Sequence, residues 1–402
     1  MIAALLATAI AAALQLWWRR KATIARLSGD EDEYLLRAHD PDPYRPILFL
    51  RMPLFTMVIR LLRGDDRTAT AERARWAMMV TGMVSVALTV YGAVQAAGSI
   101  GGLIATVVLI GLPERMILNQ HIWPDVPLSA VIAWLTLLLL GPLTGDTVVL
   151  SGFIIALAVL IRIEQLVLIP AAGLALASEV QMDLASWFDL SWPSMAVLAV
   201  WAARNGMRYG LWLPDTTPAF NLAVMRQELH GDARRPVSEL VRATVDEWRH
   251  SPGLWKQCAR EVLSSPVLVA RKLLVRTWSM LGPDTFVSQR LLPRQTGAYA
   301  DSPVWVKAWL KVSWPLTVAA LLAGLIAGSA LPAAIYPTVA VFLASVVVHS
   351  RSRYRLVCFP GVALWLALAW TGELQRLPLA IGLAVVFAVL LIRFEIRREE
   401  AS

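Results

Sequence analysis

Long apolar runs separated by shorter polar connections occupy most of the chain. The runs are not interrupted by the regularly spaced polar positions that a helix with one face in water would need. A transmembrane helix requires about 20 mostly apolar residues, and the pattern therefore predicts an all-α polytopic membrane protein with about 11 transmembrane helices. The predicted crossings are residues 2–18, 76–97, 100–112, 126–143, 147–161, 164–178, 192–206, 313–331, 333–349, 355–371 and 376–393.

Two longer polar segments divide this pattern. Residues 19–75 contain an apolar stretch, Ile47 to Phe55, followed by Arg60 and Arg63, which predicts a helix lying in the membrane interface. Residues 207–312 contain eight prolines, which predict a series of short amphipathic helices. We therefore divide the chain into an N-terminal transmembrane module (1–206, with the first outer loop at 19–75), a loop region (207–312) and a C-terminal transmembrane module (313–402).

The orientation in the membrane has two solutions. With a cytoplasmic N-terminus, both long segments and the conspicuous polar clusters fall on the outer face. The positive-inside rule favours the opposite, because Arg19, Arg20 and Lys21 follow the first helix and Arg397 and Arg398 follow the last. We expect the first solution, because the family resemblance below requires one outer site assembled from several loops.

Composition supports the membrane prediction and excludes other classes. Only 16% of residues are charged, against about 25% in soluble domains. The net charge of +8 does not indicate nucleic-acid binding, because no Lys/Arg-rich tract with interleaved aromatic residues is present. All but five of the 37 basic residues are arginines, which suit bidentate phosphate contacts.

Acidic candidates occur in two of the predicted outer loops. Asp30 and Glu31 open an acidic run that continues to Tyr34, directly after the first helix. A carboxylate beside a bilayer can act as a general base toward a hydroxyl, and a solvated loop is the alternative interpretation. Asp125 lies between two prolines, where we expect it to cap the next helix as well as to serve a site.

Basic and aromatic candidates lie at helix junctions. Arg162 stands between two predicted crossings, where a charge is costly and often functional, although a structural turn explains it equally well. Three further groups share these helix-end positions: Arg204 with Asn205, His349, and Arg353-Tyr354-Arg355. Such arginines can bind a phosphate through charge-assisted hydrogen bonds, and snorkelling to lipid head groups is the alternative.

In chain order, these segments resemble the GT-C superfamily of polytopic glycosyltransferases, which includes protein O-mannosyltransferases and aminoarabinose transferases. The resemblance is carried by Gly29-Asp30-Glu31 with Tyr34, by Asp125, by Arg162 between paired helices, by Arg204-Asn205 with the motifs after it, and by Arg353-Tyr354-Arg355-Leu356. It spans residues 28 to 371. Val357 departs from the usual proline, and Pro218-Ala219-Phe220 replaces glycines that the family often has.

The resemblance implies a sugar transferase that uses a polyprenyl-phosphate donor on the outer face of a bacterial cytoplasmic membrane. It makes Asp30 the general base, Asp125 a residue that positions the acceptor or a metal, and Arg204, Arg353 and Arg355 the phosphate contacts. Further substrate contacts are expected at Glu31, Tyr34, Arg162, Asn205, His349 and Tyr354. A divalent metal ion is left open, and the acceptor is a glycan, lipid or protein hydroxyl.

Two other functions remain open. A transporter or flippase of lipid-linked sugars would also need basic loops, although inverted repeats are expected there and none is visible. An inactive subunit of an envelope-assembly complex would keep the same residue types without turnover.

Overall fold

The structure is a computed structural model, and it describes residues 2–24, 29–46, 50–178, 180–230, 247, 254–282, 295–297, 304–326, 332–349, 354–372 and 386. The first half contains α1 (Ile2–Lys21), α2 (Gly29–His39), α3 (Pro53–Leu61), α4 (Arg67–Gly111), α5 (Pro113–Leu118), α6 (Asp125–Leu140), α7 (Gly145–Ile161), the 3₁₀ helix η1 (Ile163–Val167), α8 (Leu168–Leu176) and α9 (Leu184–Tyr209). The second half contains α10 (Thr217–His230), α12 (Trp255–Leu263), α13 (Pro266–Leu281), α14 (Val304–Ile326), α15 (Pro332–His349) and α16 (Arg355–Gly372). Two short strands, β1 (Ala22–Ile24) and β2 (Gln295–Gly297), pair antiparallel.

The prediction of a helical protein is confirmed, but the number of membrane crossings is not. Of the described helices, only α4 is both long and apolar enough to cross a membrane by length and composition. It contains two of the predicted crossings, which are separated by non-helical backbone at Ala97 and Gly98. The apolar parts of the helices at residues 125–140, 145–161, 163–176, 336–347 and 355–369 are shorter. The predicted crossing at 376–393 lies outside the described residues except for position 386.

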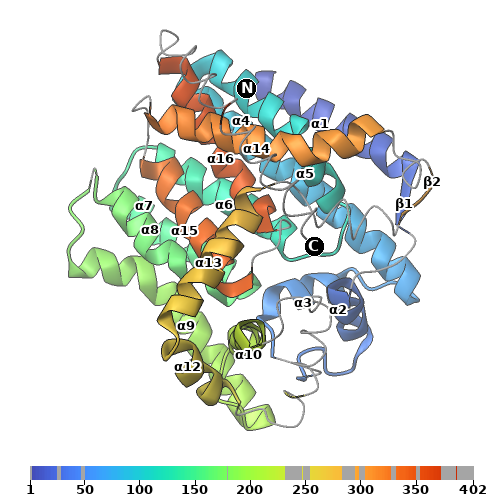
Figure 1. Cartoon of the computed structure of the whole chain (residues 1–402), viewed down its shortest axis with the longest axis vertical. Helices are drawn as coiled ribbons and strands as arrows, with labels where there is room; N and C mark the ends of the chain where they lie inside the picture. The colour runs from blue at the N-terminus through green and yellow to red at the C-terminus, as the bar shows by residue number, and fades with distance from the viewer. Residues whose placement is uncertain are drawn as a thin grey trace.

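The central core is formed by α4, α6 and α16, which pack against one another, with α1 against α4 and α7 against α9. Figure 1 shows α1, α4, α6 and α16 together in the upper half of the molecule with α7 to their left, whereas α9 extends into the lower half. Their contacting side chains are small or branched apolar residues, such as Val90, Leu135 and Ala367, all fully buried. The approach of α7 to α9 requires Gly152, because a Cβ there would lie 2.7 Å from the Asp189 carbonyl oxygen.

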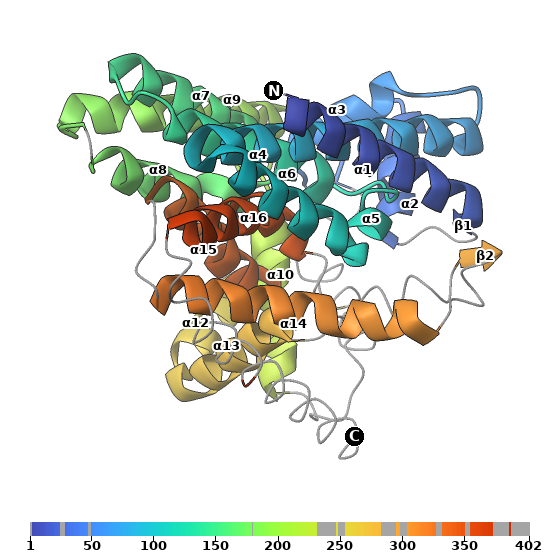
Figure 2. The same ribbon diagram turned by 90° about the horizontal axis from the view of Figure 1, so that it is seen from above.

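The predicted polar segments also form helices. In the first of them, α3 begins at Pro53, whose missing N–H suits the first helical turn, and the predicted residues 47–49 are outside the described part. In the second, α10, α12 and α13 are short helices, and α14 begins at Val304, before the predicted boundary at residue 313. Figure 2 shows α12 and α13 on the far side of α14 from α4 and α6.

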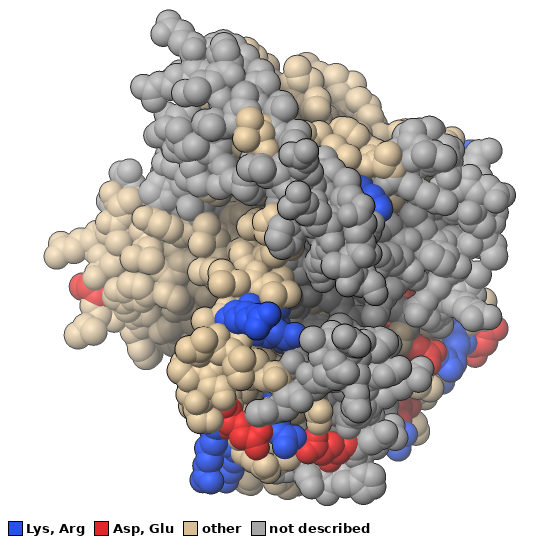
Figure 3. Space-filling model, viewed as in Figure 1, with Lys and Arg blue, Asp and Glu red and all other residues tan. Residues whose placement is uncertain are grey.

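Surface chemistry differs between these parts of the molecule. On the face seen in Figure 1, most of the described charged side chains lie in the lower part, where α12, α13 and α2 are found (Figure 3). The outer surfaces of α1, α4 and α9 instead expose large apolar side chains, including Leu5, Leu103, Val107, Phe188 and Val200. Exposure of many large apolar side chains is expected of a surface that contacts lipid or another protein.

Candidate active site

The acidic run at the start of α2 sends its side chains in different directions. Asp30, Glu31 and Asp32 all stand in the first turn, where the positive end of the helix dipole favours carboxylates. Asp30 is half-buried, whereas Glu31 is fully buried. Asp32 is exposed and pairs with Arg67 of α4. Neighbouring acids in the sequence therefore have unrelated surroundings.

Glu31 fastens α2 to the loop before α6. Its Oε1 accepts a hydrogen bond from the Ile122 backbone N–H at 3.0 Å and lies 3.1 Å from Nδ1 of His121. The His121 ring is buried and stacks on Trp123. Glu31 was expected to contact substrate, but the structure gives it these internal contacts instead.

Asp30 belongs to a group of charged residues around Tyr34. The Arg51 guanidinium binds Glu33 Oε2 at 2.7 Å and lies 5.4 Å from the centre of the Tyr34 ring. Burial raises the pKa of the Tyr34 phenol to about 12, and the charges of Arg51, Glu33 and Asp30 act on the same group. Burial opposes ionisation of Glu33, but Arg51 and Arg37 hold its pKa below the ordinary value. Tyr34 therefore stays protonated and Glu33 ionised at neutral pH.

A second group forms where α7 ends. Arg162 has an extended backbone and joins α7 to η1. Its guanidinium binds Asp125 Oδ1 at 2.9 Å and Glu164 Oε1 at 3.1 Å, and lies 4.9 Å from the centre of the Tyr354 ring. The two acids therefore share one arginine, and each side chain is less than a tenth exposed.

The prediction that Asp125 caps a helix is wrong. Asp125 is the first residue of α6, and no side chain makes a cap hydrogen bond there. Its Oδ1 binds Arg162, while its buried Oδ2 has no hydrogen-bond partner within the described part of the chain. The carboxylate is thus directed to η1 rather than to the backbone of α6.

A third segment, after α9, brings Asp215 to the same region. Thr216 ties this segment to the first outer loop, because its hydroxyl accepts from the Leu50 N–H at 2.9 Å and its N–H donates to the Leu50 carbonyl. Asp215 itself accepts from the Thr217 N–H at 2.6 Å. Burial raises the pKa of Asp215 to about 6, with a further increase from Glu164 and a decrease from Arg51. Asp215 is therefore an acid that titrates near neutrality.

We name these groups together the acid–arginine cluster. The charges of Arg51 and Arg162 both act on Tyr34, and Arg51 acts on both Glu164 and Asp215, so the groups share one electrostatic neighbourhood. The cluster comprises Asp30, Glu33, Tyr34, Arg51, Asp125, Arg162, Glu164, Asp215 and Tyr354. It joins segments distant in the sequence, as the prediction of one site assembled from several loops requires.

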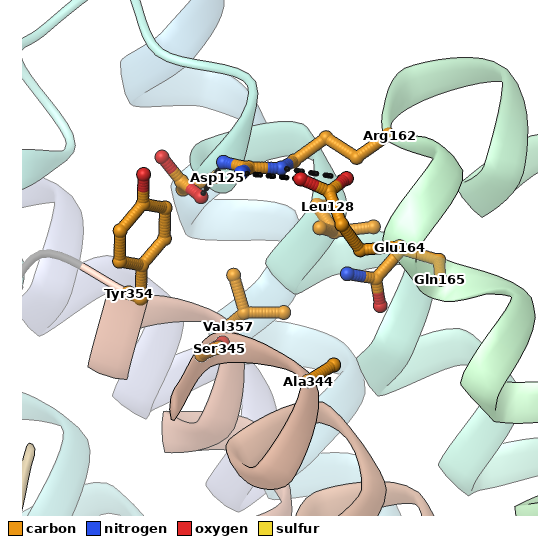
Figure 4. A pocket seen from close by; sticks show the side chains of 9 residues that line it. All are labelled: Asp125, Leu128, Arg162, Glu164, Gln165, Ala344, Ser345, Tyr354 and Val357. Atoms are coloured by element: carbon orange, nitrogen blue, oxygen red, sulfur yellow. Dashed lines mark hydrogen bonds and ion pairs between the residues drawn. The ribbon is translucent and has the colours of Figure 1, made fainter. Parts of the chain in front are cut away.

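A pocket opens beside the cluster. It contains about 280 Å³ of space between its lining atoms and its opening, and is lined by residues of α6, η1, α15 and α16. Figure 4 shows Asp125, Arg162 and Glu164 together along one side of the pocket, with Tyr354 also at its edge. Gln165 faces the same space.

An apolar groove lies on the other side of the same junction. It has a volume of about 290 Å³ and is lined almost wholly by apolar side chains of α3, α4, α6 and α7. Three of its lining residues adjoin the cluster: Phe55 contacts the Tyr34 ring edge-on, Pro127 follows Asp125 closely, and Ile161 precedes Arg162. The groove thus begins where the charged groups end.

Two of the predicted phosphate ligands lie elsewhere. Arg204 is surrounded by the rings of Tyr44, Trp201 and Tyr209, at 4.8 to 5.1 Å from their centres, and lies 3.5 Å from Asp42. The neighbouring Asn205 is fully buried and donates to the Leu213 carbonyl at 3.0 Å, which holds the turn after α9. Arg204 and Asn205 therefore connect α9 to its neighbouring loops in this structure.

Arg355 is also engaged internally. It is fully buried, binds Glu114 at 3.4 Å and the Gly282 carbonyl at 2.7 Å, and lies 5.3 Å from the Trp314 ring centre. The structure thus does not bring Arg355 to the cluster that includes the preceding residue, Tyr354. Arg353 and the side chain of His349 lie outside the described part of the chain.

Five members of the region were not predicted as site residues from the sequence: Glu33, Arg51, Glu164, Gln165 and Asp215. Glu33 belongs to the acidic run after the first helix, of which only Asp30 and Glu31 were chosen as site residues. Arg51 lies in the apolar stretch that was interpreted as an interfacial helix. Asp215 follows Pro214 in a polar turn, and only the tertiary contact of the next residue, Thr216, with Leu50 brings it to this region. Gln165 carries no distinguishing sequence signal.

A metal site is not evident in the described residues, where no group of three or more His, Cys, Asp or Glu side chains is arranged to hold an ion. The acids of the cluster are neutralised in part by Arg51 and Arg162 instead. Metal dependence stays an open question from the sequence.

Comparison with known proteins gives no match among protein-family models, curated proteins or solved structures. The family resemblance accordingly rests on the motifs quoted above.

Proposed function

We propose that the chain is a membrane glycosyltransferase that moves a sugar from a polyprenyl-phosphate donor to a hydroxyl of a glycan, lipid or protein. The observation that carries the proposal is the position of the acid–arginine cluster directly beside a long apolar groove. A lipid-linked sugar has the same division, with a charged phosphate and polar sugar joined to a hydrocarbon tail. An enzyme for such a donor needs both environments side by side.

The apolar groove suits the hydrocarbon tail. Its walls come from four helices, and its polar contribution is limited to residues such as Thr81. In a bilayer a prenyl chain leaves other hydrocarbon tails rather than water, so van der Waals packing against these walls would hold it. The head group would then lie next to Tyr34 and Arg162, at the mouth of the groove.

Asp30 is the proposed general base. It stands in the first turn of α2, half-buried, beside Tyr34 and Arg51. Removal of the acceptor proton and attack on the anomeric carbon would release the polyprenyl phosphate with inversion, without a covalent intermediate on the protein. One base is sufficient for this reaction.

The negative charge on the leaving phosphate needs cationic partners. Arg51 and Arg162 are the described arginines of the cluster, and both are shared with carboxylates, so a phosphate would compete with Glu33 or Asp125 for them. Arg353, directly before Tyr354, stays a predicted phosphate contact.

Membrane embedding in several passes, with the site on the outer face, is part of the proposal. It is supported by the length and apolar composition of α4 and by the apolar side chains exposed on α1, α4 and α9. Shorter apolar helices such as α6 and α7 would complete the span within the shelter of their neighbours.

The test is an Asp30→Asn substitution in the full chain, assayed for sugar transfer from polyprenyl-phosphate sugars. Loss of a general base lowers a rate by about 10²–10⁴-fold, so we expect a loss in that range with little change in binding of the lipid donor. Asp32→Asn is the matched control, because Asp32 lies in the same helical turn but is exposed and paired with Arg67. Full transfer activity in the Asp30 variant would refute the assignment.

A further inference from the structure

The pocket beside Arg162 contains buried hydrogen-bond acceptors that lack partners. Asp125 Oδ2 and Gln165 Oε1 are each enclosed and have no hydrogen-bond partner among the described residues. Both side chains line the same pocket, from different elements, as Figure 4 shows. Asp125 and Gln165 are 1% and 4% exposed, respectively. Native proteins leave few buried polar groups unsatisfied, and those that remain call for an explanation.

The neighbouring donors do not satisfy these acceptors. Arg162 directs Nη1 to Asp125 Oδ1 and its other donors to Glu164, at 2.9 to 3.5 Å. The arginine therefore orients the two acids and leaves Asp125 Oδ2 unpaired. Because no described residue donates a hydrogen bond to either acceptor, a bound molecule with hydrogen-bond donors can fill this role.

The charges around the pocket restrict the chemistry of such a donor. An anion inside the pocket would meet the carboxylates of Asp125 and Glu164, which disfavour it there, so the phosphate proposed to contact Arg162 would lie on the groove side of the guanidinium. A cation would meet the Arg162 guanidinium between those same acids. A neutral group with O–H donors satisfies the acceptors without either conflict, because a hydroxyl donates one hydrogen bond and also accepts.

We propose that this pocket is a subsite for hydroxyl groups of the sugar, with Asp125 and Gln165 as the residues that accept hydrogen bonds from them. The inference rests on the proposed function and adds to it a specificity-determining residue, Gln165. The enclosed volume beside these acceptors is about 10 Å³, which is room for one group the size of a water molecule, such as a single sugar hydroxyl with the ring lying at the opening. The Tyr354 ring, beside Arg162, forms part of the wall against which the sugar would pack.

Binding of lipid phosphates with and without a sugar tests the subsite. The full-length protein in lipid nanodiscs is titrated with polyprenyl phosphate and with polyprenyl phosphates carrying a hexose or a pentose. For the wild type, we expect at least one sugar-bearing lipid to bind about tenfold more tightly than the bare phosphate. Gln165→Met keeps the side-chain length but removes the acceptor, and is expected to reduce that preference several-fold without weakening binding of the bare phosphate.

Two further variants keep the test decisive. Ser151→Ala removes a buried hydroxyl that also lacks a partner in the described chain, but in α7 and away from the pocket. It is expected to preserve the sugar preference. Asp125→Asn keeps the shape of the Asp125 side chain but replaces one of its two acceptor oxygens by an NH₂ group. It provides the same test if the Gln165 variant does not fold.

Each remaining outcome has a distinct meaning. A sugar preference that persists in both pocket variants overturns the subsite and leaves the proposed function standing. Equal affinity of the wild type for all of the lipids also overturns the subsite. Failure to bind any polyprenyl phosphate overturns the proposed function and the subsite together.

Discussion

Two consecutive residues at the start of α16 belong to opposite kinds of environment. Tyr354 lies against Arg162 at the edge of a pocket with unsatisfied acceptors. Arg355 lies in a closed contact with Glu114, the Gly282 carbonyl and the Trp314 ring. Arg162 and Arg355 each stand at a helix end with an acidic partner. Arg162 faces the pocket, whereas Arg355 is fully buried.

The difference separates an arginine that can respond to a ligand from one that holds helices together. A ligand can reach the surroundings of Arg162 through the pocket, and its side chain is 15% exposed. A ligand could reach Arg355 only after separating α16 from α5 and the end of α13. An arginine next to an acid in the sequence pattern therefore does not by itself indicate a phosphate site.

The largest predicted effect is on the closed side of this comparison. Arg355→Met leaves Glu114 buried without its charged partner, and breaking a buried pair in this way costs about 3–5 kcal/mol. We expect a corresponding decrease in the free energy of unfolding, measured by thermal or denaturant unfolding in detergent. The residue was predicted as a phosphate ligand, and that role would instead reduce donor binding while leaving stability unchanged.

The double variant Arg355→Met with Glu114→Met is the control for that experiment. It removes both charges, so we expect it to be more stable than the single Arg355 variant. A double variant as unstable as the single one would contradict the ion-pair explanation.

On the open side, Arg162→Met is expected to affect activity more than stability. Removal of a group that stabilises developing charge costs about 100-fold in rate. The loss of stability should be smaller than for Arg355→Met, because the pocket can admit water beside the two carboxylates, although each is less than a tenth exposed. The measurements are the sugar-transfer rate per folded molecule and the unfolding midpoint. Arg162→Lys keeps the charge without the planar fork and should recover part of the rate.

A decrease in stability as large as that of Arg355→Met, with an unchanged rate per folded molecule, would remove the distinction between the two arginines. Both would then be structural, and the phosphate contact would have to be sought at Arg51 or Arg353.

The helical class could be predicted because long apolar runs without regularly spaced polar positions have few other solutions. Ten of the predicted crossings coincide with described helices, but the chain merges two of them into α4 and makes others, such as α8, too short to cross alone. Whether a short helix can cross a membrane depends on how the neighbouring helices surround it. The apolar sequence of the helix itself does not contain that information.

The site was predictable only in part. Asp30, Tyr34, Asp125, Arg162 and Tyr354 were candidates, and the structure brings them into one neighbourhood. The direction of each side chain was not predictable, because one step along a helix rotates the side chain by about 100°. For that reason Glu31 turns from Asp30 toward His121, and Arg355 turns from Tyr354 toward Glu114.

The smallest predicted effect concerns Asp215, which belongs to the same cluster as Arg162. Burial in the fold opposes ionisation of the Asp215 carboxyl group. Its pKa of about 6 in the folded protein is above the unfolded value of about 3.9. The folded state thus holds its proton more tightly, and its stability falls as the pH rises from about 4 to 6, by about 2 kcal/mol. Asp215→Asn keeps the acceptor for the Thr217 N–H but cannot ionise. The difference in free energy of unfolding between variant and wild type should therefore grow across this range and stay constant above it. A difference that is independent of pH would mean that Asp215 ionises as freely as a surface acid, and that the region near Glu164 is open to solvent.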